Sequence, residues 1–304
     1  MTPMLKIYSM CLERNVEKML DLIHAIFTEP KLDSNPDFLK KMIDQSAMEF
    51  QSSVVQSGNR FAKKYASSSL TQFDNWEDQF SGLRGLHYLN MLSSLEDVSF
   101  VADQLQQMKN HLLVKQDMKI LFTSENEFVP KASWAFEKFY ESIPFSTQPS
   151  VPENSQSIEF KPSSQKTYIK LPSSVNFVAQ SMIAAPFSNP DSVKLRIASN
   201  LINSLYLHQE IREKGGAYGS SANESMNGVF SFTSYRDPNA MRTVNIFDNV
   251  CDWVNQKKFT DLELQEAKLQ VFQGLDAPSS PHARAASLFT NGISDEMRQQ
   301  RRDA

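Results

Sequence analysis

The chain has 304 residues, of which 40 % are hydrophobic and 22 % are charged, a composition typical of a soluble globular protein large enough for two domains. Its net charge of −4 gives no electrostatic reason to expect binding to nucleic acid or to an anionic membrane, and no apolar run approaches membrane-spanning length. The two cysteines, Cys11 and Cys251, lie far apart and outside any metal-binding spacing. We therefore expect neither a disulfide scaffold nor a zinc knuckle, and a reducing compartment fits best.

The amino-terminal part of the chain predicts a strand followed by two helices. Residues 5–12 alternate in the manner of a strand. Apolar residues then recur at helical spacing from Asn15 until Pro30 closes the repeat. Asn35 and Pro36 favour the start of a second, longer helix, because asparagine can cap a helix and proline suits its first position.

The next part is predominantly helical. Residues 58–113 keep a helical period that is broken near Gly82 and Gly85 and renewed at Ser94. Residues 118–123 then predict a strand, and residues 131–143 an aromatic-rich helix. This order of elements indicates an α+β layer in which helices cover one face of a sheet, so we expect residues 1–143 to form an α+β domain.

A linker and a second domain are expected to follow. Residues 144–165 are rich in serine and proline, poor in apolar residues, and therefore predict a linker. Residues 166–304 predict a second α+β domain. Its expected strands are 167–171, a central strand 176–184, and a hairpin 218–224 and 229–235 around Asn227 and Gly228; its expected helices are 190–212, 240–256, 260–275 with a capping box of Thr260 and Glu263, and 294–304. The last helix reaches the final residue without a stop signal.

Residues 201–220 hold the candidate functional site. An amphipathic helix runs into Gly215 and Gly216 and then into a strand, and either glycine can take the left-handed conformation that ends a helix. The reversal brings Arg212 near Tyr218, and a guanidinium and a phenol held together can polarise a carbonyl and stabilise an oxyanion. The alternative is that Arg212 only complements the negative end of its helix and Tyr218 is an ordinary strand residue. Spacing alone favours this alternative, because helix-Gly-Gly-strand junctions are common.

The run LHQEIREKGGAYG at residues 207–219, followed by SYRDP at 234–238, resembles the carboxy-terminal half of the pitrilysin-type (inverzincin) zinc metallopeptidases, in the presequence-protease branch. The resemblance implies that Arg212 and Tyr218 are the arginine and tyrosine that reach the zinc-bound scissile carbonyl. It implies two pitrilysin-type sheet-plus-helix domains, the first lacking its beginning and the second its end. It also implies degradation of targeting presequences and other short unstructured peptides, in the mitochondrial matrix or in plastids, although the sequence itself gives no targeting signal.

The zinc motif of that family, His-x-x-Glu-His, does not occur in this sequence. None of the five histidines has a second histidine four residues away, and His208 with Glu210 does not close a zinc site. We therefore expect no metal in this chain, zinc in an absent amino-terminal half that is its partner, and no activity from the chain alone. The alternative function is a non-catalytic pitrilysin-like assembly or peptide-binding subunit, against which the Arg212–Tyr218 pair argues.

Overall fold

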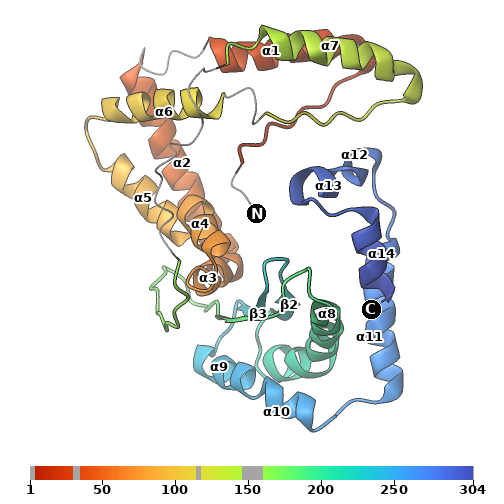
Figure 1. The fold of residues 1–304 in the computed structure, drawn as a ribbon. Coiled ribbons are helices and arrows are strands. Elements are labelled where there is room, and N and C mark those ends of the chain that lie inside the picture. Colours follow the sequence, from red (N-terminus) through yellow and green to blue (C-terminus); the bar gives the residue numbers. More distant parts are fainter. Residues whose placement is uncertain (1–3, 30–34, 114–117, 146–159, 304) are drawn as a thin grey trace. The chain divides into compact units, whose positions relative to one another are not determined.

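The computed structural model describes residues 4–29, 35–113, 118–145 and 160–303 (Figure 1). Contacts group the chain into two compact units. Unit 1 comprises Met1–Ile43, Leu92–Ile158 and Ser279–Ser294, and unit 2 comprises Asp44–Met91, Glu159–Pro278 and Asp295–Ala304. Two of the divisions fall inside α2 (Pro36–Gln56) and α5 (Leu83–Ser93). Most of the expected linker lies outside the described residues, so the linear division into 1–143, 144–165 and 166–304 stays a prediction.

The described part of unit 1 is helical, and its core lies between α1 and α7. Its elements are η1 (Glu13–Asn15), α1 (Val16–Thr28), the beginning of α2, α6 (Ser99–Leu112), η3 (Asn126–Phe128), α7 (Val129–Ser142), α12 (Pro281–Arg284) and α13 (Ala286–Asn291). Leu20 of α1 and Phe139 of α7 are buried together with Leu113, Ala135 and Ile143. The predicted start of the second helix is confirmed, since the Phe38 N–H donates a hydrogen bond to Asn35 Oδ1 over 2.9 Å.

Two strands that the sequence predicted in this part of the chain are wrong. Residues 5–12 and 118–123 form no regular structure, and the described residues of unit 1 contain no strand. Alternation alone does not make a strand, because its backbone needs a paired neighbour and one of its faces needs a covering layer. Leu5 is 65 % exposed and Met10, on the other face of the alternation, is 80 % exposed, so neither face is covered. The expected sheet of the first domain is thus contradicted for the residues described.

Three consecutive helices of unit 2 meet at a buried carboxylate. They are α3 (Gly58–Ser67), α4 (Gln72–Ser81) and α5. Asp78, fully buried near the end of α4, accepts a hydrogen bond from the Leu83 N–H over 3.0 Å and forms an ion pair with Arg84 Nε at 2.8 Å. Burial raises the pKa of Asp78 despite the opposing effect of Arg84. The predicted break at Gly82 is confirmed, whereas Gly85 lies inside α5 and the next helix begins at Ser99.

The sheet of unit 2 has three antiparallel strands in the order β1-β3-β2. The predicted hairpin is confirmed by β2 (Gly219–Glu224) and β3 (Val229–Tyr235), which turn at Gly228 with φ +81°. The strand predicted at 176–184 is present as β1 (Ala179–Ile183), but it pairs only with β3, which takes the central place. No strand forms at 167–171, where the side chains are exposed. Helix α3 packs against β1 and β3 (Figure 1).

The remaining helices of unit 2 surround the core of this sheet. They are α8 (Asp191–Leu201), the π-helix η4 (Ile202–Glu213), α9 (Ala240–Asp248), α10 (Val250–Asn255), α11 (Asp261–Asp276) and α14 (Asp295–Asp303). Helix α8 and η4 pack against β2, and Leu207, Ile211, Phe232 and Phe247 are buried between strands and helices. The predicted capping box of Thr260 and Glu263 is confirmed. Within the described ranges, no helix has both the length and the apolar character needed to cross a membrane.

A polar network joins α4 to the turn of the hairpin. The side-chain amide of Asn227 donates hydrogen bonds to Asp74 Oδ2 and to Thr71 Oγ1, and the Ser67 hydroxyl donates to Asp74 Oδ1 over 3.2 Å. Burial is the largest influence on Asp74 and raises its pKa, against the lowering effect of these hydrogen bonds. The network fixes the turn at the price of a partly desolvated carboxylate.

We expect Gly82→Ala to lower the free energy of unfolding by about 1–3 kcal/mol. A Cβ at this position would lie 2.1 Å from Asp78 Oδ1 and 2.7 Å from the Asp78 Cα, so the helix junction would have to shift. Gly274→Ala is the matched control, because its Cβ would come no closer than 3.9 Å to any neighbour and alanine favours a helix interior. Urea unfolding measures both variants, and equal stability of the two would contradict this account of Gly82.

We expect Asp74→Asn to flatten the pH dependence of stability. Because the folded chain raises the pKa of Asp74, the stability linked to this group is present below its unfolded pKa and is lost as pH rises through its folded pKa. Urea unfolding between about pH 4 and about pH 7 measures the slope. Repulsion from Glu77 contributes to the shift, so Glu77→Gln is expected to reduce the slope only in part. An unchanged slope in Asp74→Asn would show that another group carries it.

Candidate functional site

The candidate site is built on the π-helix η4, whose last turn ends at the reversal into β2. Leu207 and Ile211 are fully buried and fasten this helix to the core of unit 2. The N–H of Lys214 donates to the carbonyl of Gln209 over 2.9 Å, the five-residue spacing that defines a π-helix. This wider winding brings side chains five residues apart onto one face. Short π-helical stretches are frequent at functional sites.

The two glycines of the reversal have different roles. Gly216 has φ +76°, which a residue with a side chain rarely adopts, so it is the left-handed residue that the sequence assigned to either glycine. A Cβ on Gly215 would lie 2.4 Å from the Ile211 carbonyl oxygen and 2.7 Å from Arg242 Nη1, so Gly215 permits a close approach. The Ala217 N–H donates to the Ile211 carbonyl over 3.1 Å and closes the turn.

Arg212 lies on the last turn of η4 and is exposed. Its Nη1 lies 3.4 Å from His208 Nε2, and His208 Nδ1 lies 3.3 Å from Glu213 Oε1. His208 therefore touches residues four and five positions further on, as the π-helical winding allows. The predicted status of His208, a partly exposed helix residue, is confirmed by its 46 % side-chain exposure.

Tyr218 lies at the entrance to β2 and is 69 % exposed. Its backbone N–H donates to the Tyr235 carbonyl over 3.0 Å, which adds one pair to the ladder between β2 and β3. Its ring meets the Tyr235 ring edge-on, with centroids 5.7 Å apart and planes at 79°. The phenol is thus held on a strand end while most of its ring faces solvent.

The structure places Arg212 and Tyr218 at the ends of one short reversal, as the sequence predicted, with both side chains at the surface. A guanidinium offers several donors in a fixed plane, and a phenol offers one neutral donor. Donors of these two kinds, presented side by side along one reversal, suit a ligand with a carbonyl or carboxylate oxygen. Their joint action on one atom stays a prediction.

Sequence reasoning missed a charged cluster beneath the reversal. Glu210 forms ion pairs with Lys214 Nζ at 2.5 Å and with Arg242 Nη2 at 3.6 Å. Burial, with a smaller contribution from Glu210, raises the pKa of Tyr206, whose hydroxyl donates to the Ile246 carbonyl over 3.1 Å. The four-residue spacing of Glu210 and Lys214 is a signal that the sequence contained, whereas the partner from α9 is visible only in the fold.

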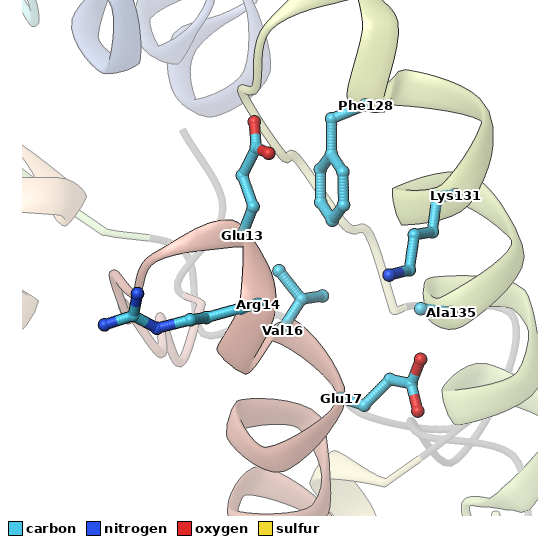
Figure 2. Close-up of a pocket in the computed structure, with 7 residues that line it drawn as sticks. All are labelled: Glu13, Arg14, Val16, Glu17, Phe128, Lys131 and Ala135. Atoms are coloured by element: carbon cyan, nitrogen blue, oxygen red, sulfur yellow. The ribbon is translucent and has the colours of Figure 1, made fainter.

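Metal ligands and cavities contribute little to the site. Over the part of the chain that the structure describes, no group of three or more His, Cys, Asp or Glu side chains could hold a metal ion. A hollow in unit 1 between Val16 and Phe128 is bordered by Glu13, Glu17 and Lys131, with Arg14 pointing away (Figure 2), and its volume of about 20 Å³ holds roughly one water molecule. A cavity of about 260 Å³ between α8, α10 and α11 is lined mostly by apolar side chains, among them Trp253 and Phe259.

Comparisons with known proteins agree with the resemblance in the site. A family model described as peptidase-associated matches residues 1–92, and one described as "PreP C-terminal domain" matches residues 166–304. The mitochondrial presequence protease of Danio rerio is 33 % identical over 315 residues, covering 97 % of this chain and 31 % of that protein. That of Schizosaccharomyces pombe is 34 % identical over 295 residues, covering 96 % and 29 %. The chain therefore spans less than a third of the length of these relatives.

A solved structure shares the fold. A conserved protein from Enterococcus faecalis V583 superposes with a TM-score of 0.58 at 16 % identity, covering 95 % of this chain and 69 % of that one. The two family models together account for both ends of the sequence, and one of them includes the reversal with Arg212 and Tyr218. The chain belongs to the presequence-protease branch of the pitrilysin-type peptidases.

Proposed function

We propose that this chain is the carboxy-terminal portion of a zinc metalloendopeptidase that degrades targeting presequences and other short unstructured peptides. The observation that carries the proposal is the exposure of Arg212 and Tyr218 together at one rigid reversal. The relatives are named as mitochondrial presequence proteases, and on that likeness we assign the enzyme to the mitochondrial matrix.

Arg212 and Tyr218 have the chemistry that peptide-bond hydrolysis requires of groups opposite the metal. When the scissile carbonyl is attacked, its oxygen gains negative charge, and donors aimed at that oxygen act mainly on the transition state. Arg212 supplies a permanent positive charge, and the Tyr218 phenol supplies a neutral donor whose hydrogen bond strengthens as the charge develops. The buried anchors Leu207 and Ile211 hold the helix that carries the arginine, so little reorganisation accompanies the reaction.

The proposal assigns the metal to an amino-terminal half that pairs with this chain. A zinc ion bound there would polarise the carbonyl and activate water. The contribution of this chain is to wall the reaction chamber, exclude competing water and present its two donors. Peptides are short enough to enter such a chamber when unfolded, which fits substrates without stable structure.

We expect the isolated chain to bind no stoichiometric zinc and to hydrolyse no peptide. His208 has Arg212 and Glu213 beside it, a set with too few ligands for a zinc site. Metal analysis after equilibration with zinc and dialysis measures the content, with His208→Ala as the matched variant. One tightly held zinc per chain that disappears in His208→Ala would overturn this assignment.

In the enzyme assembled with its amino-terminal half, we expect Tyr218→Phe to lower kcat on the order of 10²–10³-fold, or ~3–4 kcal/mol, with a smaller effect on KM. The phenylalanine keeps the ring and its contact with Tyr235 but removes the donor. Tyr168→Phe is the matched control, because Tyr168 is an even more exposed tyrosine outside the reversal. Zinc content and thermal unfolding should be unchanged in both variants.

We expect Arg212→Lys to impair turnover as well, because an ammonium cannot reproduce the planar fork of a guanidinium. Arg298→Lys, on the exposed face of α14, is its control. Wild-type turnover in both Tyr218→Phe and Arg212→Lys would reduce the pair to a helix end and a strand residue. The non-catalytic peptide-binding or assembly role would then be the better description.

A further inference from the structure

Tyr235 links the exposed Tyr218 to the interior of unit 2. It is the last residue of β3, and its half-buried ring supports the Tyr218 ring from the side, with the centroids 5.7 Å apart. The same residue accepts the backbone hydrogen bond of Tyr218 over 3.0 Å. Tyr218 is thus joined to Tyr235 through both its main chain and its ring.

Three further contacts fix Tyr235. Its hydroxyl donates over 3.0 Å to the carbonyl of Gln56, the last residue of α2, whose carbonyl lacks a partner within its own helix. The Phe177 ring packs against it with centroids 5.6 Å apart, and the Arg236 guanidinium lies over it at 5.5 Å. A tyrosine held at its hydroxyl, at its ring and at its backbone has one available rotamer.

We propose that Tyr235 is the positioning residue that orients the Tyr218 phenol for catalysis, an inference that rests on the proposed function. An exposed tyrosine on a strand end would otherwise sample several rotamers, and only some of them aim its hydroxyl at a bound carbonyl. The edge-on contact with a fixed ring selects one of them. Displacement of a catalytic group by about 1 Å costs on the order of a hundredfold in rate, so orientation at this position matters.

Phe177 extends this support to α3. A Cβ on Gly58, the first residue of α3, would lie 2.2 Å from the Phe177 ring, so the helix touches the ring where it has no side chain. Gln56 and Gly58 flank the junction of α2 and α3, and both hold the aromatic group from the same side of the sequence. The orientation of Tyr218 therefore depends on a segment far from it in the chain.

A double-mutant cycle in the assembled enzyme tests the proposal, with Tyr235→Leu, Tyr235→Phe, Tyr218→Phe and the two double variants. We expect Tyr235→Leu to lower kcat on the order of ten- to a hundredfold with little change in KM, because binding does not need the phenol but the transition state does. Tyr235→Phe keeps the supporting ring and loses only the bond to Gln56, so it is expected to retain most of the rate. In the Tyr218→Phe background, neither change at Tyr235 should slow the enzyme further.

The outcomes separate this inference from the proposed function. If Tyr218→Phe is impaired but Tyr235→Leu is not, or if the two losses multiply in the double variant, Tyr235 does not act through Tyr218 and the inference fails alone. If Tyr218→Phe turns over at the wild-type rate, the proposed function fails and the inference with it. Should Tyr235→Leu not fold, the Tyr235→Phe arm gives the same cycle.

A spectroscopic measurement on the 304-residue chain needs no activity. The ring-proton shifts of Tyr218, identified by comparison with Tyr218→Phe, report the nearby Tyr235 ring. We expect these shifts to be kept in Tyr235→Phe and to move toward free-tyrosine values in Tyr235→Leu. Unchanged Tyr218 shifts in a folded Tyr235→Leu chain would overturn the proposed contact.

Discussion

The unit that carries the site depends on complete pairing of β3. This strand is buried at every residue from Val229 to Ser234, and buried backbone groups must find hydrogen-bond partners. β1 pairs with it on one side and β2 on the other, so its position is satisfied only when both neighbours are in register. The packing of α3, α8 and η4 follows from this requirement, because each covers a strand that the central one has fixed. The turn at Gly228 and the contact of Tyr235 with Gln56 then mark the two ends of the same strand.

The candidate site is a local consequence of that pairing. Tyr218 is placed by a backbone hydrogen bond to Tyr235, and Arg212 by a π-helix whose buried residues pack on the sheet. Between them the chain needs a left-handed residue and a close approach to the helix carbonyls, which Gly216 and Gly215 provide. Neither donor is buried, so the scaffold holds their backbones firmly and leaves their polar groups available. This arrangement separates the stability of the unit, carried by apolar residues, from the chemistry of the surface.

Signals that act over a few residues were predictive, and those that need a distant partner were not. The capping box at Thr260, the cap at Asn35 and the hairpin at Gly228 each satisfy backbone groups within a single turn, and all are confirmed. The alternating segments at 5–12, 118–123 and 167–171 had the side-chain pattern of strands but gained no partner. β1 was taken for the central strand because it is apolar, whereas the central strand has polar residues such as Ser231 and Ser234 that hydrogen-bond inside the sheet. The contact of Tyr235 with Gln56 joins residues 179 apart and has no signature in either segment.

The exposure of the two donors also constrains how they can act. A hydrogen bond from Tyr218 to a charged oxygen competes with water while the ring is 69 % exposed, and the interaction of Arg212 with that oxygen is weakened by the high dielectric constant of the solvent. The same two groups become strong only where water is excluded, since the effective dielectric constant falls and the donors are already oriented. Under the proposed function, closure by the other half of the enzyme supplies this exclusion, and the rigid reversal of this chain supplies the orientation. Each half then holds a component that has little catalytic effect by itself, which restricts peptide hydrolysis to the closed chamber.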